Sequence, residues 1–568
     1  MRLVMGEVAD GWRRRVAGLA PAFSTLRASG LGRAMPPLIR GRPEWASDIY
    51  RGTFSFAGHT GWAVGGAAFI EAAAPVDWQA QLHGFDWLRH LAAAGRELNR
   101  VNARALIADW ISLTGRHPAP ARRNDVVARR LMAWIGHAPF YVRGASQAFE
   151  AALFRSLSRQ VRLLLRGLRA EPDCRHRLIG AIALAQASVG LQGLEALKDP
   201  AFAALEAELD AQVLPDGGHR SRNPADVAAL MVDLVPLRMA LDAARLEIPE
   251  RFNAAIERML PALRFFSHGD GGLAAFNGLR DNMAGWARAV IETDNVHGKP
   301  LIHAVHSGYG RLQAGQAVVI ADVGRTPHPG SNPQAGLGAL SFEFSDGAHR
   351  IIVNCGALAA PDIDWDMAAR HTAAHSTACL GAEPAGRILS NRLVRYIFGG
   401  PIALGPGQVE ADVTANAEGM LLVARHDGYE RAFGVTHERR LFLAANGRDL
   451  RGEDRFLADL EHLDHLTSID FAIRFHLHPS LNASLSRDRS SVMLVLPNRQ
   501  GWRFSARGGV MGLEDSVYLP GHAKPRRGQQ IVLKGAVGRP DRVQWAIKRM
   551  ERSAPSSGNR ASEPELPL

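Results

Sequence analysis

The sequence predicts two structural classes in tandem, an all-α N-terminal region followed by an all-β region, with the change near residue 295. Before that point, apolar residues recur at three- and four-residue steps, which is the spacing of an amphipathic helix. One such series is Leu98, Val101, Ala105, Ala108 and Ile111. After that point apolar and polar residues alternate, as they do along β-strands. The 568 residues allow two to four domains, and a chain that is 46% hydrophobic and 22% charged has ordinary globular composition.

The helical region continues through several further amphipathic segments. They include VVARRLMAWIGHAPF (126–140), FEAALFRSLSRQVRLLL (149–165) and AAIERMLPALRFF (254–266). Successive helices of this length must bury their apolar faces on one another, which predicts a bundle, a solenoid or a closed toroid. We assign residues 1–40 to an N-terminal extension and residues 41–294 to the helical domain.

The β region begins with a recognisable hairpin. The segment ALSFEF places Leu340, Phe342 and Phe344 on one face of a strand, Asp346-Gly347 supplies a turn, and HRIIVNCG returns as the next strand. Further alternating segments follow at short spacing, so a large antiparallel sheet or sandwich is expected over 295–550. The tail, 551–568, is rich in Ser, Pro, Glu and Gly and is expected to be disordered.

Composition argues against several classes of protein and site. No run approaches the roughly 20 apolar residues that a membrane span needs. The three cysteines have no paired spacing, which argues against a disulfide framework and against a structural zinc site. Three arginines precede a short apolar run at the N-terminus, but Glu7, Asp10 and Pro21 are atypical of a signal peptide. A cytoplasmic location is therefore expected, with the periplasm as the alternative.

The net charge of +11 comes almost entirely from arginines scattered along the chain. A nucleic-acid reader needs clustered basic residues together with stacking aromatics, and no such cluster is present. A basic groove for an acidic polysaccharide fits the same charge. We therefore expect an acidic polysaccharide or oligosaccharide as partner, and no nucleic acid.

Two polar segments are candidates for chemistry. The first is VLPDGGHRSRNPADV (213–227), which on local grounds is a turn at Asp216-Gly217 and a helix start capped by Asn223. The second is ARHTAAHST (369–377), where His371 and His375 would share one face of a helix and could bind a metal ion. The pair His476 and His478 in RFHLHP is interpreted as structural.

Several motifs together resemble the heparinase II/III-like polysaccharide lyase family. They are HSGYGRL, ALSFEFSDGAHRIIVNCG, RHTAAHST and HERRLFLAANGRDLRGEDRF, in that order, and the resemblance extends from about residue 87 to 533. It implies an N-terminal (α/α) toroid of helical hairpins followed by a C-terminal antiparallel β-sandwich, with substrate in the cleft between them. It also implies that His375 faces the cleft or a structural metal. Arg370 matches the family motif, whereas His371 and Ser376 replace its usual serine and asparagine.

Lyases of this type break a glycosidic bond by β-elimination beside a uronic acid. The substrate carboxylate must be neutralised by hydrogen bonding, a base removes the C5 proton and an acid protonates the leaving oxygen. This chain departs from the pattern: Asp226 stands where the catalytic tyrosine is expected and Gln334 where a histidine is expected. Asp is a poor proton donor at neutral pH without a large upward pKa shift, and Gln cannot act as a base.

The resulting hypothesis is a lyase that acts on a uronate-containing acidic glycan. Its candidate catalytic residues are His219, His375 and Tyr309, and its candidate substrate-binding residues are Arg222, Asn223, Gln334 and Arg370. No cofactor is required, although a structural zinc or calcium ion at His375 is kept as an option. The alternative is a non-catalytic glycan-binding protein that keeps the fold and the cleft. The sequence does not determine the oligomeric state.

Overall fold

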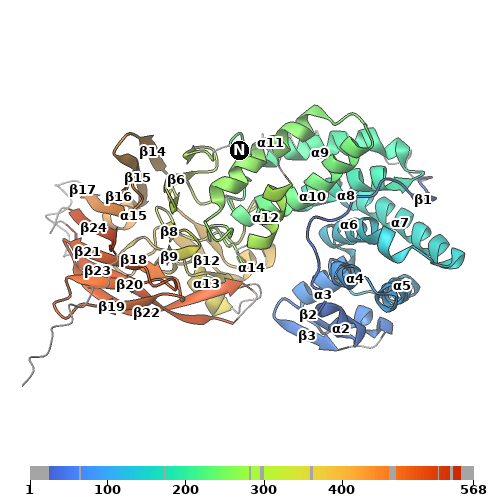
Figure 1. The fold of residues 1–568 in the computed structure, drawn as a ribbon, viewed down its shortest axis with the longest axis horizontal. Coiled ribbons are helices and arrows are strands. Elements are labelled where there is room, and N and C mark those ends of the chain that lie inside the picture. The colour runs from blue at the N-terminus through green and yellow to red at the C-terminus, as the bar shows by residue number, and fades with distance from the viewer. Residues whose placement is uncertain are drawn as a thin grey trace, which may run out of the picture.

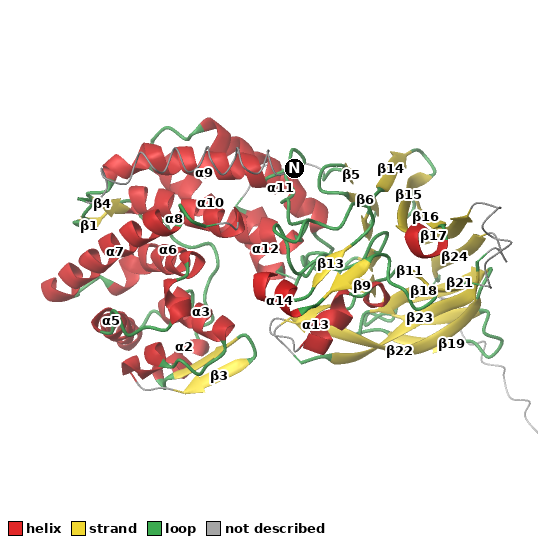
Figure 2. Cartoon of the chain, turned by 180° about the vertical axis from the view of Figure 1, so that it is seen from behind, coloured by secondary structure: helices red, strands yellow, loops and turns green. Residues whose placement is uncertain are grey.

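The computed structural model describes residues 25–62, 65–171, 174–280, 283–293, 300–358, 363–398, 400–458, 469–521, 524–537 and 542–551. Helices occupy the N-terminal half and sheets the C-terminal half, as predicted (Figures 1 and 2). The last helix of the helical part ends at Glu292 and the first strand of the sandwich begins at His303. The start of the predicted N-terminal extension and nearly all of the predicted tail lie outside the described residues.

The helical part is a curved array of helices that opens toward the sandwich (Figure 1). Its helices are α2 (Trp45–Tyr50), α3 (Val76–Gly84), α4 (Leu88–Ala94), α5 (Glu97–Ser112), α6 (Asn124–Tyr141), α7 (Gln147–Gly167), α8 (Cys174–Gly190), α9 (Lys198–Gln212), α10 (Pro224–Ala243), α11 (Glu250–Phe266) and α12 (Ala284–Glu292). Two small antiparallel ribbons join them, β1 (Gly30–Leu31) with β4 (Leu191–Gln192) and β2 (Thr53–Phe56) with β3 (His59–Trp62). Neighbouring helices bury one continuous apolar core, as the sequence requires.

Helix α5 confirms the predicted helix, but the apolar series from Leu98 to Ile111 that predicted it is not its buried face. Leu98 and Val101 are 55% and 48% exposed, whereas Leu106, Ile107 and Trp110 are buried. Both series have helical spacing, so periodicity alone does not distinguish them. The helix buries the series with the larger side chains because that removes more apolar area from water.

The sandwich consists of two sheets. The first sheet has 10 strands. Strand β11 (Ala378–Leu380) pairs with β18 beside the main path, whose order is β10 (Gly356–Leu358), β22 (Val510–Gly521), β23 (Arg526–Ala536), β18 (Asp470–Leu477), β9 (His349–Val353), β8 (Phe342–Asp346), β7 (Ala317–Asp322), β6 (Tyr309–Ala314) and β5 (His303–Ala304). The second is 8-stranded, with order β14 (Val409–Ala415), β15 (Gly419–Tyr429), β16 (Val435–Ala444), β17 (Asp449–Ala458), β24 (Arg542–Arg549), β21 (Gly501–Arg507), β20 (Ser491–Val495) and β19 (Asn482–Leu485). The named pairs in both sheets are antiparallel except for β10 with β22.

Short elements complete the sandwich half. They are α13 (Ile363–Arg370), α14 (Arg392–Phe398), α15 (Glu430–Phe433) and the ribbon of β12 (Arg387–Leu389) with β13 (Ile402–Leu404). Of these, α13 and the 3₁₀ turn Thr372–Ala374 matter most for the site, because they carry the ARHTAAHST segment.

Strand β8 confirms the predicted apolar face and adds a second buried face. Phe342 stacks on Trp545 of the other sheet at 5.5 Å between ring centroids, and Phe344 meets Trp502 at 5.2 Å. On the opposite face, Glu343 Oε2 lies 3.2 Å from Nε2 of His268, which belongs to the helical half. The polar face of this strand is therefore an interface between the two halves and not a solvent-exposed surface.

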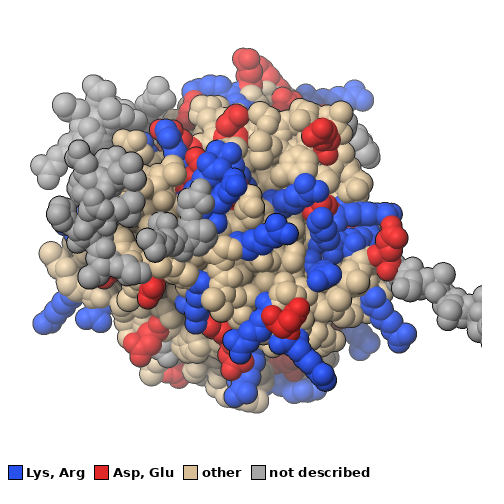
Figure 3. Space-filling model, turned by 90° about the vertical axis from the view of Figure 1, so that its left-hand side faces the viewer, with Lys and Arg blue, Asp and Glu red and all other residues tan. Residues whose placement is uncertain are grey.

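The end of the sandwich has mixed charge. Figure 3 shows Lys and Arg side chains interspersed with Asp and Glu on this face. Two of the ion pairs on the 8-stranded sheet join Arg425 to Glu410 at 2.6 Å and Arg451 to Asp449 at 2.7 Å. Among the described residues, no helix is both long enough and apolar enough to cross a bilayer.

Candidate functional site

The loop between α9 and α10 forms a tight turn followed by a capped helix start. Gly217 has a φ of 79°, and a side chain there would collide with the carbonyl group of Arg258, so the turn requires glycine. Asn223 Oδ1 accepts a hydrogen bond from the backbone N–H of Ala225 at 2.9 Å, and Pro224 is the first residue of α10. The predicted cap is therefore confirmed, and the Oδ1 atom of Asn223 serves the helix.

His219 lies inside this loop and is only 2% exposed. Its Nδ1 is 2.8 Å from Ser221 Oγ and its Nε2 is 3.2 Å from Gln212 Oε1. Ser221 Oγ donates to Asp226 Oδ2 at 2.7 Å, which extends the hydrogen-bonded chain to the first turn of α10. Both ring nitrogens thus have partners within the protein, and the imidazole has almost no contact with solvent.

Asp226 is deprotonated at neutral pH. Burial raises its pKa, but the charges of Arg175 and His219 outweigh this effect, and the pKa lies below its ordinary value. Arg175 Nε is 3.0 Å from Asp226 Oδ1. A carboxylate held in this way accepts hydrogen bonds and cannot replace a tyrosine as proton donor.

Arg222 joins the helical half to the sandwich. Its Nε donates to the carbonyl oxygen of Ser307 at 2.7 Å and its Nη2 donates to that of Gly308 at 2.9 Å. The same guanidinium pairs with Asp322 at the end of β7 and lies over the ring of Tyr309, 4.8 Å from its centroid. This side chain is committed to the interface, so it is not placed to neutralise a substrate carboxylate.

Tyr309 is part of the same buried joint and is 0% exposed. Its hydroxyl donates to the carbonyl oxygen of Arg222 and accepts from Asn277 Nδ2 at 2.7 Å. Burial raises the pKa of Tyr309 well above its ordinary value, even though Arg222 opposes the shift. The phenol is therefore neutral and enclosed, in a position that supports the joint and gives no access to a substrate.

Three other predicted site residues, Gln334, Arg370 and His375, do meet at one pocket. Asn277 and Arg280 of the helical half line the same pocket, which therefore lies where the two halves of the chain meet. Its volume is about 20 Å³, room for about one water molecule. These three side chains therefore lie close together, but the pocket is too small to enclose a sugar ring.

Arg370 is the last residue of α13, and its guanidinium is bound within the protein. It donates to Asp366, one helical turn earlier, at 2.9 Å from Nη2 to Oδ1, and to the carbonyl oxygen of Pro333. The i, i+4 spacing of Asp366 and Arg370 makes this pair visible in the sequence. A substrate carboxylate would have to compete with Asp366 for the guanidinium.

His375 follows the 3₁₀ turn and is 7% exposed. Its Nδ1 lies 3.0 Å from the carbonyl oxygen of His371, an acceptor, so Nδ1 carries the proton and Nε2 the lone pair. Burial lowers the pKa of His375 to about 4, which leaves the ring neutral at pH 7. A neutral ring in this tautomer can accept a proton through Nε2, but only as a weak base, and it cannot neutralise a carboxylate.

Two glycines make room for this histidine. A Cβ at Gly338 would lie 2.5 Å from Cδ2 of His375, and one at Gly336 would lie 2.9 Å from its Nε2. The NPQAGLGAL segment therefore needs small residues at these positions for the ring to occupy its site. Gln334 belongs to the same segment, and its backbone N–H is held by Asn332 Oδ1 at 2.9 Å.

The option of a metal at His375 finds no support in the geometry. Within the described parts of the chain, no group of three or more His, Cys, Asp or Glu side chains is arranged to hold a metal ion. His371 does not share a helical face with His375, because α13 ends at Arg370 and the chain continues as a 3₁₀ turn. Among the described residues, His375 therefore lacks the set of His, Cys, Asp or Glu ligands that a zinc site needs.

Comparison with known proteins agrees with the fold and the motifs. Residues 296–546 match the family model described as heparinase II/III-like, C-terminal. The chain is also 35% identical over 500 residues to FtsZ-localized protein C of Caulobacter vibrioides (strain NA1000 / CB15N), covering 86% of this chain and 84% of that protein. The chain belongs to the heparinase II/III-like family.

Solved structures extend the likeness of this heparinase II/III-like protein to the helical half. A crystal structure of heparinase III superposes with a TM-score of 0.68 at 14% identity, covering 95% of this chain and 90% of that one. Heparan sulfate lyase HepC from Pedobacter heparinus gives 0.57 at 15% identity, covering 96% and 88%. At these identities the matches show the fold alone, a helical toroid followed by a β-sandwich.

Proposed function

We propose that this heparinase II/III-like protein does not cleave glycans and instead acts as a binding protein that localises with FtsZ. One observation carries the first half of the proposal. His219 and Tyr309, two of the three side chains expected to transfer protons, are 2% and 0% exposed and hydrogen-bonded within the protein. A general acid or base must come within hydrogen-bonding distance of its substrate, and neither group can do so here.

The electrostatics of the predicted site support the same conclusion. Arg175, Arg222 and Arg370 each face a carboxylate, at Asp226, Asp322 and Asp366 respectively. Pairing cancels much of the attraction that these cations would exert on an anionic polymer. The overall charge of +11 therefore does not translate into a basic substrate groove at this site.

The second half of the proposal concerns the partner. The 35% identical relative is named for its localisation with FtsZ, and the likeness covers both halves of the chain. We infer that this chain localises with FtsZ as well. Contacts of Arg222, Tyr309 and Asn332 hold the toroid and the sandwich together. The joined halves can therefore present binding surfaces in a fixed arrangement. Asn332 Nδ2 donates to the carbonyl oxygens of Ser221 at 3.0 Å and Asn277 at 2.9 Å, which ties the segments together.

Sedimentation with polymerised FtsZ tests the partner. We expect the full chain to pellet with FtsZ filaments in the presence of nucleotide and to stay in the supernatant when FtsZ is unpolymerised or absent. Recovery only in the supernatant under all three conditions would reject FtsZ as a direct partner. The lack of catalysis is tested separately, by looking for unsaturated uronate products, so the two halves of the proposal can fail independently.

A lyase remains the second candidate because Gln334, Arg370 and His375 converge on one pocket between the two halves of the chain. In this case a movement of the halves would have to widen the pocket, and the Gln334 amide would contact the substrate carboxylate. The His375→Ala variant tests this candidate, since Nε2 of His375 is the only proton acceptor proposed for the pocket. Uronate cleavage by the wild-type chain that the variant lacks would establish the lyase.

A further inference from the structure

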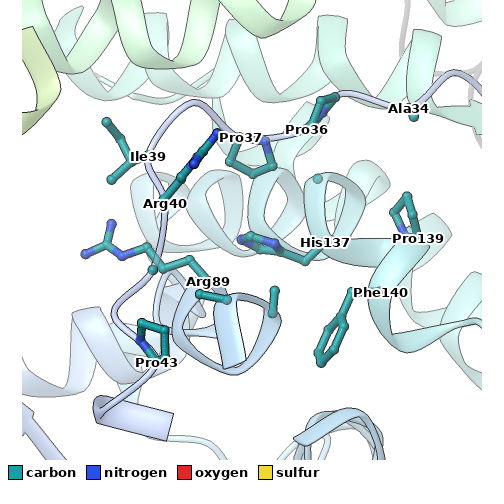
Figure 4. A pocket seen from close by; sticks show the side chains of 14 residues that line it. Ala34, Pro36, Pro37, Ile39, Arg40, Pro43, Arg89, His137, Pro139 and Phe140 are labelled. Atoms are coloured by element: carbon teal, nitrogen blue, oxygen red, sulfur yellow. The ribbon is translucent and has the colours of Figure 1, made fainter. Parts of the chain in front are cut away.

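A second cavity lies on the helical half, between helices α4 and α6 and the segment 34–43, which lies outside helices and strands and which we call the strap. Its volume is about 590 Å³, within the range of ligand pockets. It shares no lining residue with the pocket at His375. Figure 4 shows the strap bending around the cavity, with Arg40 and Arg89 toward one end, Pro139 and Phe140 toward the other, and His137 between them.

The cavity wall is apolar except for cationic and imidazole groups. Its apolar lining includes Pro36, Pro37, Ile39, Ala93, Pro139 and Phe140. Among the described residues that line it, the polar side chains are Arg40, Arg89 and His137, and none is Asp or Glu. A cavity of this composition favours a ligand with an apolar body and a negatively charged group, because the two arginines attract the charge and the prolines and Phe140 cover the body.

The local charge is not compensated within the described part of the chain. Neither Arg40 nor Arg89 makes an ion pair or a side-chain hydrogen bond there, in contrast to the paired arginines at the interface of the two halves. Burial and the charge of Arg89 lower the pKa of His137 to about 4. The pKa of the adjacent His90 is also lowered to about 4, by burial and then by Arg89 and Arg42. Burial is the larger cause of both shifts, and the positive charges of the neighbouring arginines act in the same direction.

The strap offers backbone hydrogen-bonding groups as well. Its flanks are fixed, because Arg33 N–H donates to the carbonyl oxygen of Val189 at 3.0 Å and Arg42 N–H donates to His90 Nδ1 at 2.9 Å. Between them, residues 34–41 make no backbone hydrogen bond to any described residue. A segment fixed at both ends, with its C=O groups and the N–H groups of its non-proline residues unpaired by described main-chain groups, is able to bond to the main chain of a peptide.

From these observations we propose that the cavity binds a short extended segment of a partner protein that presents a bulky apolar side chain next to a carboxylate. The apolar side chain enters between the strap and Phe140, the carboxylate pairs with Arg89 and Arg40, and the peptide backbone bonds to the strap. A peptide is favoured over a small metabolite because the unpaired main-chain groups of the strap complement those of a peptide backbone. This inference goes beyond the proposed function and does not depend on which protein supplies the segment.

Selection from a phage-displayed library of random heptapeptides against the full chain tests the proposal, with the Arg40→Gln/Arg89→Gln variant as counter-selection. We expect the enriched peptides to share Asp or Glu beside Phe, Leu, Ile or Trp. A synthetic peptide from the enriched set, measured by fluorescence anisotropy, should bind Arg89→Gln about tenfold more weakly, because a charge-assisted pair is lost. Ala93→Phe should weaken binding at least as much by filling the cavity, and since Ala93 is exposed the fold should tolerate it.

Arg33→Gln is the matched control, because it removes an exposed arginine from the position just before the strap without touching the cavity lining. It should leave the peptide affinity unchanged. Three results would overturn the proposal: no enrichment over the counter-selection, enrichment of peptides without an acid or without a bulky apolar residue, or equal binding to the wild type, Arg89→Gln and Ala93→Phe.

Discussion

Replacing Arg222 by methionine should destabilise the protein strongly, because the guanidinium is a structural joint. Asp322 is 4% exposed, and without Arg222 it keeps hydrogen bonds from the Asn277 amide and the Gly324 N–H, each at 3.2 Å, but no cation. Removing one partner of a buried ion pair costs about 3–5 kcal/mol of unfolding free energy. The lost hydrogen bonds to the carbonyl oxygens of Ser307 and Gly308 act in the same direction.

The unfolding free energy lost in Arg222→Met should depend on pH. Burial raises the pKa of Asp322 even with Arg222 present, and the variant should raise it further. A carboxyl whose folded pKa lies above its unfolded pKa contributes stability at low pH and loses it as pH rises through the folded value. The deficit of Arg222→Met relative to wild type should therefore be larger at pH 8 than at pH 5. Asp322→Asn in the same chain should recover part of it, because the buried charge is gone.

Urea unfolding followed by tryptophan fluorescence provides the measurement, with each transition fitted separately because the chain has two structural halves. If Arg222 were instead a free substrate contact, its replacement would change stability by less than about 0.5 kcal/mol, as at ordinary surface sites. A variant as stable as wild type at pH 8 would therefore refute the assignment of Arg222 to the joint.

Three further predictions follow from the same contacts. Tyr309→Phe should cost about 1–3 kcal/mol in urea unfolding, since the buried Arg222 carbonyl loses this donor and the Asn277 amide keeps only its longer bond to Asp322, at 3.2 Å; an unchanged midpoint would contradict the buried placement. Stability should fall as pH drops from about 6.5 to 4, because His137 and His375 stay neutral when folded and bind protons on unfolding. At pH 6 each of these histidines should add about 0.75 proton to the proton uptake on unfolding, which calorimetry in buffers of different ionisation enthalpy measures. The His375→Gln variant should lack the share of the uptake that comes from His375. Gly338→Ala should cost about 1–3 kcal/mol by crowding the His375 ring, and His375→Ala in the same chain should relieve the crowding; equal losses in both backgrounds would show that the ring is not the obstacle.

Local and periodic features of the fold could be predicted from the sequence. Alternation in ALSFEF identified the buried face of β8, and the Asn223-Pro224 pair identified the start of α10. The apolar stripe chosen for α5 was wrong because two series with helical spacing compete on one helix, and only packing against the neighbouring helices selects between them. The opposite face of β8 was not assigned a partner, since His268 lies 75 residues earlier and belongs to another structural half.

In the candidate site, too, local features could be predicted from the sequence and long-range contacts could not. Arg370 and His375 line one pocket, because they are close in the sequence and held by one turn. Sequence could not show that Arg222 pairs with Asp322, a partner 100 residues away, or that Tyr309 turns its hydroxyl toward the Arg222 backbone. Residue type indicates what chemistry a side chain can perform, but burial decides whether a substrate can reach it.

The central claim, that this chain does not cleave uronate glycans because His219 and Tyr309 are buried within the protein, is tested most directly by ultraviolet absorbance of the unsaturated uronate product. The purified full chain is incubated with a panel of uronate polysaccharides, with and without zinc or calcium, beside a heparinase as positive control. We expect no increase in absorbance over the no-enzyme reaction on any substrate. A rise on one substrate that His375→Ala abolishes would contradict the claim and establish a lyase whose active centre is the pocket at His375.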